Sequence, residues 1–119
     1  MPLFVDRCME TTTTTGTGNI TTAGAVAGYR TLNTGYGLNV YIPYCIEAVD
    51  ANGVATGEWE TGEGTLTGTT TFVRSVVKDS SNAGALVAFS AGTKRIFASL
   101  TAAQSARRNG YNAHIWRAP

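Results

Sequence analysis

Three carboxylates stand close together beside an indole ring, in the segment Glu58-Trp-Glu-Thr-Gly-Glu63. A pair of carboxyl groups next to an aromatic ring is an arrangement that glycoside hydrolases use for acid and base catalysis. Successive side chains of a strand point to opposite faces, so Glu58 and Glu60 share one face and Glu63 lies on the other. The spacing of a calcium-binding loop is also missing. We therefore interpret the three carboxylates as the solvated face of a hairpin.

The remaining residues offer little other chemistry. His114 is the single histidine, and no serine stands in a Gly-x-Ser-x-Gly sequence, so we expect no catalytic residue and no enzymatic activity. Cys8 and Cys45 are far apart and do not form a Cys-x-x-Cys pair; we favour two buried thiols and leave a disulfide open. No set of metal ligands has usable spacing, and no glycine-rich segment continues into a phosphate loop, so we expect no metal and no cofactor.

Size and charge exclude several other classes of function. The chain has 119 residues, a net charge of +1 and 14% charged residues, which suits one domain with an ordinary core. A basic face for nucleic acid is absent over most of the chain, so we expect no nucleic-acid partner. No apolar run approaches the roughly 20 residues that cross a bilayer, and the first residues do not resemble a signal peptide, so we expect no membrane association.

Nineteen threonines and fourteen glycines favour strands and turns over long helices. Short alternating segments at this spacing predict an all-β fold, a small antiparallel β-sandwich or barrel. The expected strands are Leu3–Glu10 extended by Thr11–Thr15, Asn19–Thr22, Tyr29–Leu32, Asn39–Val49, Glu58–Thr67, Thr70–Val77, Ala85–Phe89 and Lys94–Ser99.

Individual segments give sharper expectations. The segment from Asp50 to Gly53 predicts a hairpin turn, because Asn-Gly tolerates positive φ. Ala85–Phe89 and Lys94–Ser99 should form a last hairpin, and Trp59 should lie in the core or cover one end of a sheet. Asp6, Arg7 and Glu10 should face solvent or a neighbouring element.

The end of the chain differs from the rest, so we divide it into a β domain, residues 1–99, and a C-terminal part, residues 100–119. Residues 99–108 suit one short helix that stops at Asn109-Gly110. An extended tail, 111–119, follows with the aromatic and arginine residues that are enriched at protein interfaces.

An ordered set of segments resembles small β-rich structural modules of tailed-bacteriophage virion proteins. The segments are Asp6-Arg-Cys-Met-Glu-Thr-Thr-Thr-Thr-Thr-Gly-Thr-Gly18, Ala25-Val-Ala-Gly-Tyr29, Tyr44-Cys-Ile-Glu-Ala-Val-Asp50, Trp59-Glu-Thr-Gly-Glu-Gly-Thr65, Ser80-Ser-Asn-Ala-Gly-Ala-Leu-Val-Ala-Phe-Ser-Ala-Gly-Thr-Lys94 and Ile96-Phe97. They run over roughly residues 6 to 99. The residues after Ser99 depart from the shared region.

The resemblance implies a structural protein of the virion without enzymatic activity. We expect a capsid decoration, or cement, protein that binds the major capsid protein and forms a homo-oligomer, with a trimer suiting local three-fold positions. A tail, spike or fibre-base component is the first alternative. The second is a carbohydrate-binding module, in which Trp59 and tyrosine residues on an exposed face would stack on sugar rings. Under the leading hypothesis the partner-binding residues are Phe4, Val5, Arg107, Arg108, Tyr111, Ile115, Trp116 and Arg117.

Overall fold

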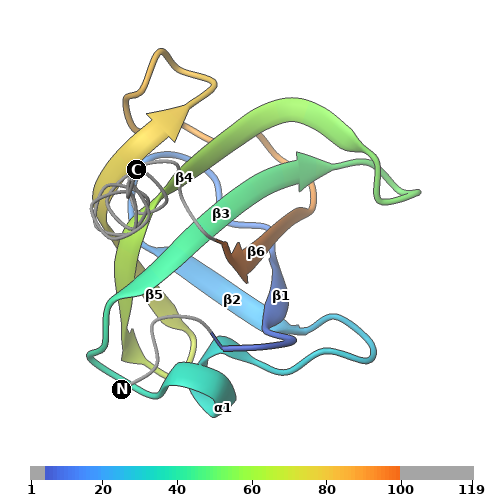
Figure 1. The fold of residues 1–119 in the computed structure, drawn as a ribbon. Coiled ribbons are helices and arrows are strands. Elements are labelled where there is room, and N and C mark those ends of the chain that lie inside the picture. The colour runs from blue at the N-terminus through green and yellow to red at the C-terminus, as the bar shows by residue number, and fades with distance from the viewer. Residues whose placement is uncertain (1–4, 100–119) are drawn as a thin grey trace, which may run out of the picture.

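The computed structural model describes residues 5–99, which fold into a closed antiparallel barrel of six strands (Figure 1). Around the barrel the order is β1-β2-β5-β4-β3-β6, and β6 pairs with β1 to close it. The predicted all-β class is confirmed, and of the two expected architectures the barrel is the one that forms. The elements are β1 (Met9–Thr12), β2 (Ile20–Ala25), α1 (Leu32–Tyr36), β3 (Ile42–Val49), β4 (Ala55–Gly68), β5 (Thr71–Ser80) and β6 (Lys94–Ala98).

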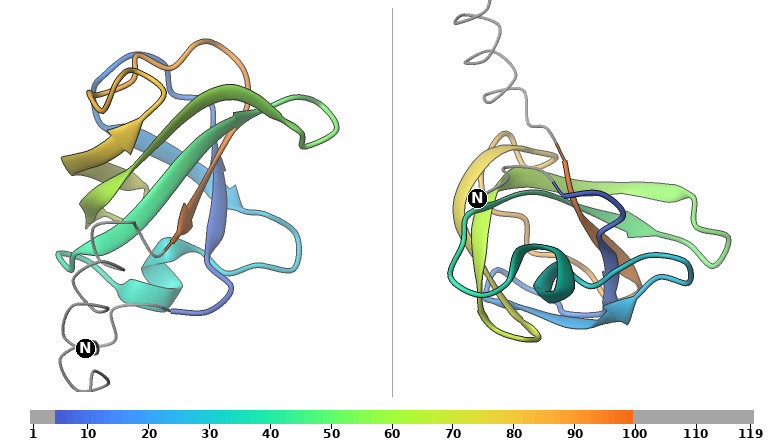
Figure 2. Two further views of the ribbon diagram at one scale, coloured as in Figure 1. Left: turned by 45° about the horizontal axis from the view of Figure 1, so that its top comes forward. Right: turned by 60° about the horizontal axis from the view of Figure 1, so that its bottom comes forward.

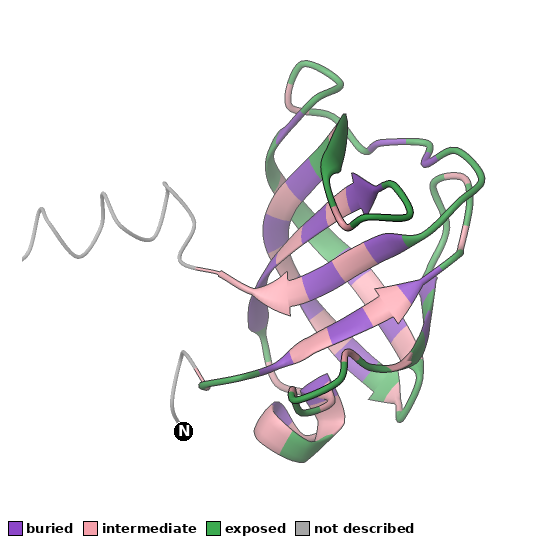
Figure 3. Ribbon diagram, turned by 90° about the vertical axis from the view of Figure 1, so that its right-hand side faces the viewer, coloured by how far each residue is buried: buried purple, intermediate pink, exposed green. Residues whose placement is uncertain are grey.

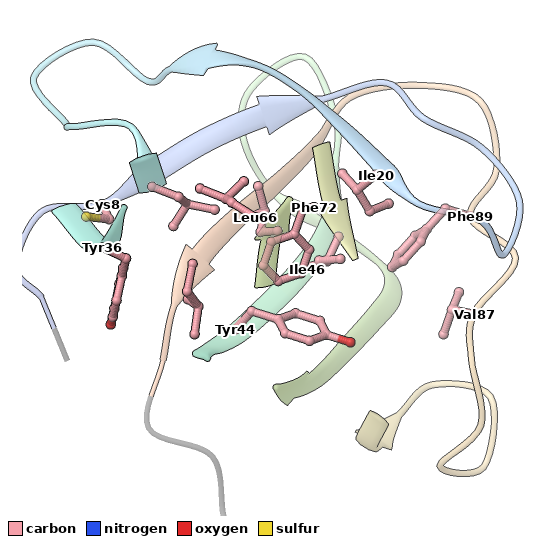
Figure 4. Close-up of a cluster of buried hydrophobic side chains, with 12 residues drawn as sticks. Cys8, Ile20, Tyr36, Tyr44, Ile46, Leu66, Phe72, Val87 and Phe89 are labelled. Atoms are coloured by element: carbon pink, nitrogen blue, oxygen red, sulfur yellow. The ribbon is translucent and has the colours of Figure 1, made fainter. Parts of the chain in front are cut away.

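Buried and less buried residues alternate along much of the barrel wall (Figure 3). In β4 the predicted division into two faces is confirmed: Glu60, Gly62, Gly64 and Leu66 are buried, whereas the residues between them are more exposed. The inward side chains join one apolar core along the barrel (Figure 4). This core consists of Cys8, Ile20, Leu32, Tyr36, Ile42, Tyr44, Ile46, Leu66, Phe72, Val87, Phe89 and Ile96.

Two glycines of β4 make room for aromatic rings in this core. Gly62 is the register partner of Tyr44, and a methyl group in its place would overlap the carbonyl oxygen of Val76. A methyl group on Gly64 would overlap the ring of Phe72. The two rings meet edge to face, with centroids 5.0 Å apart, a geometry that aromatic pairs prefer. Glycine in this strand therefore allows a close approach between backbone and core.

Within residues 5–99 there is one short helix, which crosses one end of the barrel (Figure 2, right). The predicted strand at Tyr29–Leu32 is wrong, because the chain turns there into α1. Thr31 is the N-cap, and its hydroxyl accepts a hydrogen bond from the Thr34 amide at 3.0 Å. The carboxylate of Glu10 accepts another from the Leu32 amide at 2.9 Å, so this distant acid satisfies a first-turn donor.

Two further expectations need adjustment, and a third is confirmed. The first strand begins at Met9. Asp6 and Arg7 are exposed, and Glu10 is buried against the neighbouring helix, so these residues face solvent or a neighbouring element as predicted. The expected strand Ala85–Phe89 is absent; only Phe89 bridges to Gly16, and β6 pairs with β1 and β3 instead of forming a hairpin. The turn after β3 is confirmed: the Asp50 carboxylate accepts hydrogen bonds from the amides of Asn52 and Val54.

Candidate functional site

A buried ion pair joins the inward faces of β4 and β5. Glu60 is fully buried, and one of its carboxylate oxygens lies 3.1 Å from Nη1 of Arg74 on β5. The same oxygen accepts a hydrogen bond from the Val87 amide at 2.9 Å, and the other accepts one from the Tyr44 hydroxyl at 2.7 Å. Both oxygens of the carboxylate are therefore engaged by protein donors. The prediction that Glu60 faces solvent is wrong.

Arg74 connects this ion pair to two loops. Its guanidinium donates to the carbonyl oxygens of Gly16 and Gly18 in the β1–β2 connection and of Val87 in the β5–β6 connection. It also lies over the ring of Phe89, with Cζ 5.7 Å from the centroid. These contacts join segments that are far apart in sequence. Arg74 was not predicted as a functional residue. It lies two positions after the buried Phe72, so its side chain points to the same inward face of β5.

The electrostatics of this cluster make it a structural centre. Burial, followed by the hydrogen bond to Glu60, raises the pKa of the Tyr44 hydroxyl far above its usual range, so the tyrosine stays protonated as a donor. The Arg74 and Glu60 charges compensate each other where water is excluded. Since the carboxylate oxygens already have partners, Glu60 is not placed to act as a general acid or base on a substrate.

The other two carboxylates of the sequence cluster lie elsewhere. Glu58 accepts hydrogen bonds from the Ser90 amide at 3.0 Å and the Ser90 hydroxyl at 2.7 Å. The backbone donor, and then the hydroxyl, lower the pKa of the Glu58 carboxyl. Glu63 is at an outward position of β4. The chain thus separates the three acids into one buried residue, one at a loop and one on the outer surface, rather than arranging them as a catalytic pair.

Beside this loop lies a second buried charge. Lys94 is the first residue of β6, and its side chain is buried inside the barrel. The ammonium group donates a hydrogen bond to the Ser90 carbonyl at 2.7 Å. Burial lowers its pKa, and the nearby Glu58 opposes this shift. Ser90 therefore links the positive and negative side chains at the end of the barrel.

Trp59 does not lie in the core, the first of its two expected places. It lies at an outward position of β4 with 36% of its surface exposed. Its amide donates a hydrogen bond to the Ser81 hydroxyl, and its carbonyl accepts hydrogen bonds from the amide and the hydroxyl of Ser81. Other large apolar side chains exposed on the described part of the chain are Leu38, Tyr41, Val54, Val76 and Leu86.

Of the predicted partner-binding residues, the structure describes only Val5. Its side chain is half-buried and packs against the core, and its amide donates to the Tyr36 hydroxyl at 3.0 Å. The other residues and the predicted C-terminal helix lie outside residues 5–99; those residues are Phe4, Arg107, Arg108, Tyr111, Ile115, Trp116 and Arg117.

Both cysteines are free: Cys8 is buried in the core and Cys45 is half-buried on β3. Within residues 5–99 no three metal-ligating side chains gather into a potential metal site. In the same range, no helix has the length and apolar character needed to cross a membrane. No family model, curated protein or solved structure matches the chain.

Proposed function

We propose that the protein is a non-enzymatic structural component of a bacteriophage virion, a cement protein that binds and stabilises the major capsid shell. The observation that carries this proposal is that the acidic side chains which could act in catalysis instead form structural hydrogen bonds within the barrel. The Glu60 carboxylate joins strands β3, β4 and β5 and the loop at Val87, and the Glu58 carboxylate binds the Ser90 loop. Because these side chains hold the barrel together, they indicate a rigid scaffold for binding rather than a site for a reaction.

The resemblance to virion modules is the second support. Its segments include residues 44–49 of β3, residues 59–65 of β4 and residues 80–94, and they contain Tyr44, Glu60 and Val87. The resembling segments therefore contain Glu60 and two of its hydrogen-bond partners, whereas Arg74 lies outside them. We infer that the resemblance reflects a small rigid body of this kind and that other surfaces select the partner.

A cement role suits a body of this kind because a shell repeats every contact by symmetry. A modest interaction at each site, multiplied over the assembled capsid, stabilises the assembly by mass action. A homo-oligomer with subunits around a local three-fold position would add to this effect.

The copy number of the protein in purified particles tests the proposal. Quantitative mass spectrometry against the major capsid protein should give hundreds of copies per particle for a cement protein. A tail, spike or fibre-base component would be present in roughly a dozen copies or fewer. Absence from mature particles would contradict both structural roles.

A second experiment locates the binding residues. We expect a chain without residues 111–119 to lose binding to capsids, whereas Thr13→Ala, an exposed substitution in the β1–β2 connection, should bind like the wild type. Circular dichroism must show an unchanged β spectrum in both variants. Full binding by the truncated chain would show that residues 111–119 are not the contact.

The exposed indole favours one second candidate, carbohydrate binding. Trp59 stands on the outer surface of a strand with Glu47 as its neighbour on β3, and an aromatic ring beside a polar side chain can stack on a sugar. A glycan array with the wild type and Trp59→Ala decides this. Binding that disappears in the variant would replace the structural proposal.

A further inference from the structure

The barrel carries a continuous outer wall across four strands. One row of register partners runs Met9, Phe97, Cys45 and Thr61 from β1 through β6 and β3 to β4. These residues alternate with buried neighbours such as Ile96, so their side chains lie on the outside of the barrel. We call this row the outer wall. Three of its four side chains are apolar.

Acidic groups flank the outer wall. Asp79 on β5 is the register partner of Thr61 and is exposed. In the adjoining rows Glu63 is the partner of Pro43, and Glu47 lies between Trp59 and Arg95. Of the nearby cations, Arg95 places its guanidinium against Gly53 in the β3–β4 turn, and Lys78 is exposed on β5.

The chain leaves the barrel at this surface. Ala98 is the last residue of β6, and the Ser99 amide donates to the Pro43 carbonyl at 2.8 Å, next to Cys45. The following twenty residues therefore start at the edge of the outer wall. An attached segment has an effective concentration in the millimolar range for a nearby site, far above that of a second molecule in dilute solution.

The composition of these twenty residues complements the outer wall. Residues 100–119 contain three arginines and no acid, whereas residues 1–99 contain all eight acids and six basic residues. The segment thus has a charge of +3 and the rest of the chain −2. It also holds Tyr111, Ile115 and Trp116, which are suited to cover apolar side chains.

We propose that residues 100–119 bind back onto the outer wall of the same chain, with the aromatic residues over Phe97 and Cys45 and arginines near Glu63 and Asp79. This goes beyond the proposed function, because it concerns the protein before it meets any partner. A partner that binds residues 100–119, which we call the arm, must then displace them from the outer wall, so the free energy of docking is subtracted from that of partner binding.

The Cys45 thiol provides a probe for this docking in the full-length protein. Its reaction with N-ethylmaleimide can be followed separately from that of Cys8, because trypsin cleavage after Arg30 and Arg74 places the two cysteines on different peptides. Cys8 is buried in the core and reports opening of the whole barrel. Burial already raises the pKa of Cys45 to about 11, which slows its reaction at neutral pH.

Reversal of two arm charges should expose the thiol. In Arg107→Glu/Arg108→Glu we expect Cys45 to react about 3- to 10-fold faster, with Cys8 unchanged, because two attractive pairs become repulsive. Adding Glu63→Arg/Asp79→Arg should restore the slow rate. Thr13→Glu/Thr15→Glu, which adds negative charge in the β1–β2 connection, should leave both rates unchanged.

A second variant removes apolar contact without changing charge. Trp116→Ala should also speed the reaction of Cys45 relative to Cys8. The proposal is wrong if neither arm variant raises the rate at Cys45 above the change at Cys8, or if the reversed wall charges fail to restore it. Protection of Cys45 that disappears on about hundredfold dilution of the protein would also overturn it, because the arm would then come from a second copy.

Discussion

At the scale of single residues, the strongest constraint is the ion pair between Glu60 and Arg74. Its side chains are almost completely excluded from water. A buried pair of charges is costly to form, and removing one partner leaves the other uncompensated. The energetic consequence of a substitution here depends on whether a lone charge remains.

We predict that Glu60→Ala lowers the free energy of unfolding by about 3–5 kcal/mol, as Arg74→Ala does. The double variant Glu60→Leu/Arg74→Met should lose clearly less than the sum of the single losses, because no lone charge is left. Urea denaturation measures all of them, with Glu47→Ala on the outer surface as a control that changes stability by about 0.5 kcal/mol or less. Additive losses would show that the two charges do not interact.

The carboxylate of Glu58 gives a pH-dependent effect. Its folded pKa lies below the ordinary value of 4.5, because Ser90 donates two hydrogen bonds to the charged form. This contribution to stability is present above pH 4.5 and is lost as the pH falls through the lower folded pKa. We predict that Glu58→Gln lowers the melting temperature near neutral pH and that the difference from the wild type closes in strong acid. Thermal unfolding across this range measures it, and a difference independent of pH would contradict the assignment.

At the scale of elements, the close contact between β4 and its neighbours depends on glycine. An alanine at Gly62 would overlap the carbonyl of Val76, so we expect Gly62→Ala to cost about 1–3 kcal/mol of stability. Gly18→Ala is a suitable control, because no atom lies within 4 Å of the added methyl group. Urea denaturation of both variants is the measurement. Equal stability of the two would mean that the strands separate without cost.

Elements with local signals could be predicted from the sequence, and those set by distant contacts could not. The turn from Asp50 to Gly53 was predictable because its carboxylate and its glycine act within four residues. The helix α1 was missed because its first-turn donor is satisfied by Glu10, which is 22 positions away. The barrel closes because β6 pairs with both β1 and β3. No local sequence pattern predicts which distant strands β6 pairs with or in which register.

The candidate site likewise combines a feature that the local sequence predicts with one that depends on a distant residue. The alternation of side chains along β4 correctly placed Glu60 and Glu63 on opposite faces, but a lone acid at such a position is easier to explain as solvated. Its burial follows only once Arg74 is seen at an inward position of the adjacent strand. A pair of opposite charges at inward positions of neighbouring strands is the signal that could have identified this site.

At the scale of the whole molecule, the closed barrel is not equally strong around its circumference. β3 and β4 pair through six consecutive residues, Ile42 to Glu47, before the first irregularity. The seam between β2 and β5 has only two register pairs, those of Ile20 and Thr21. Beside it the hydroxyl of Thr22 is buried without a hydrogen-bond partner, which costs about 1–3 kcal/mol. The barrel should therefore open first between β2 and β5.

Arg74 counteracts this weakness, because it extends from β5 to the carbonyls of Gly16 and Gly18, just before β2. We predict that amides of residues 20–22 and 70–72 exchange with deuterium faster than those of residues 42–47, since local opening needs less free energy than global unfolding. Thr22→Val should slow exchange at the seam by removing the unpaired hydroxyl. Arg74→Ala should accelerate exchange at the seam more than in β3. Hydrogen-exchange mass spectrometry resolves these segments, and a uniform change over the barrel would show that it opens only as a whole.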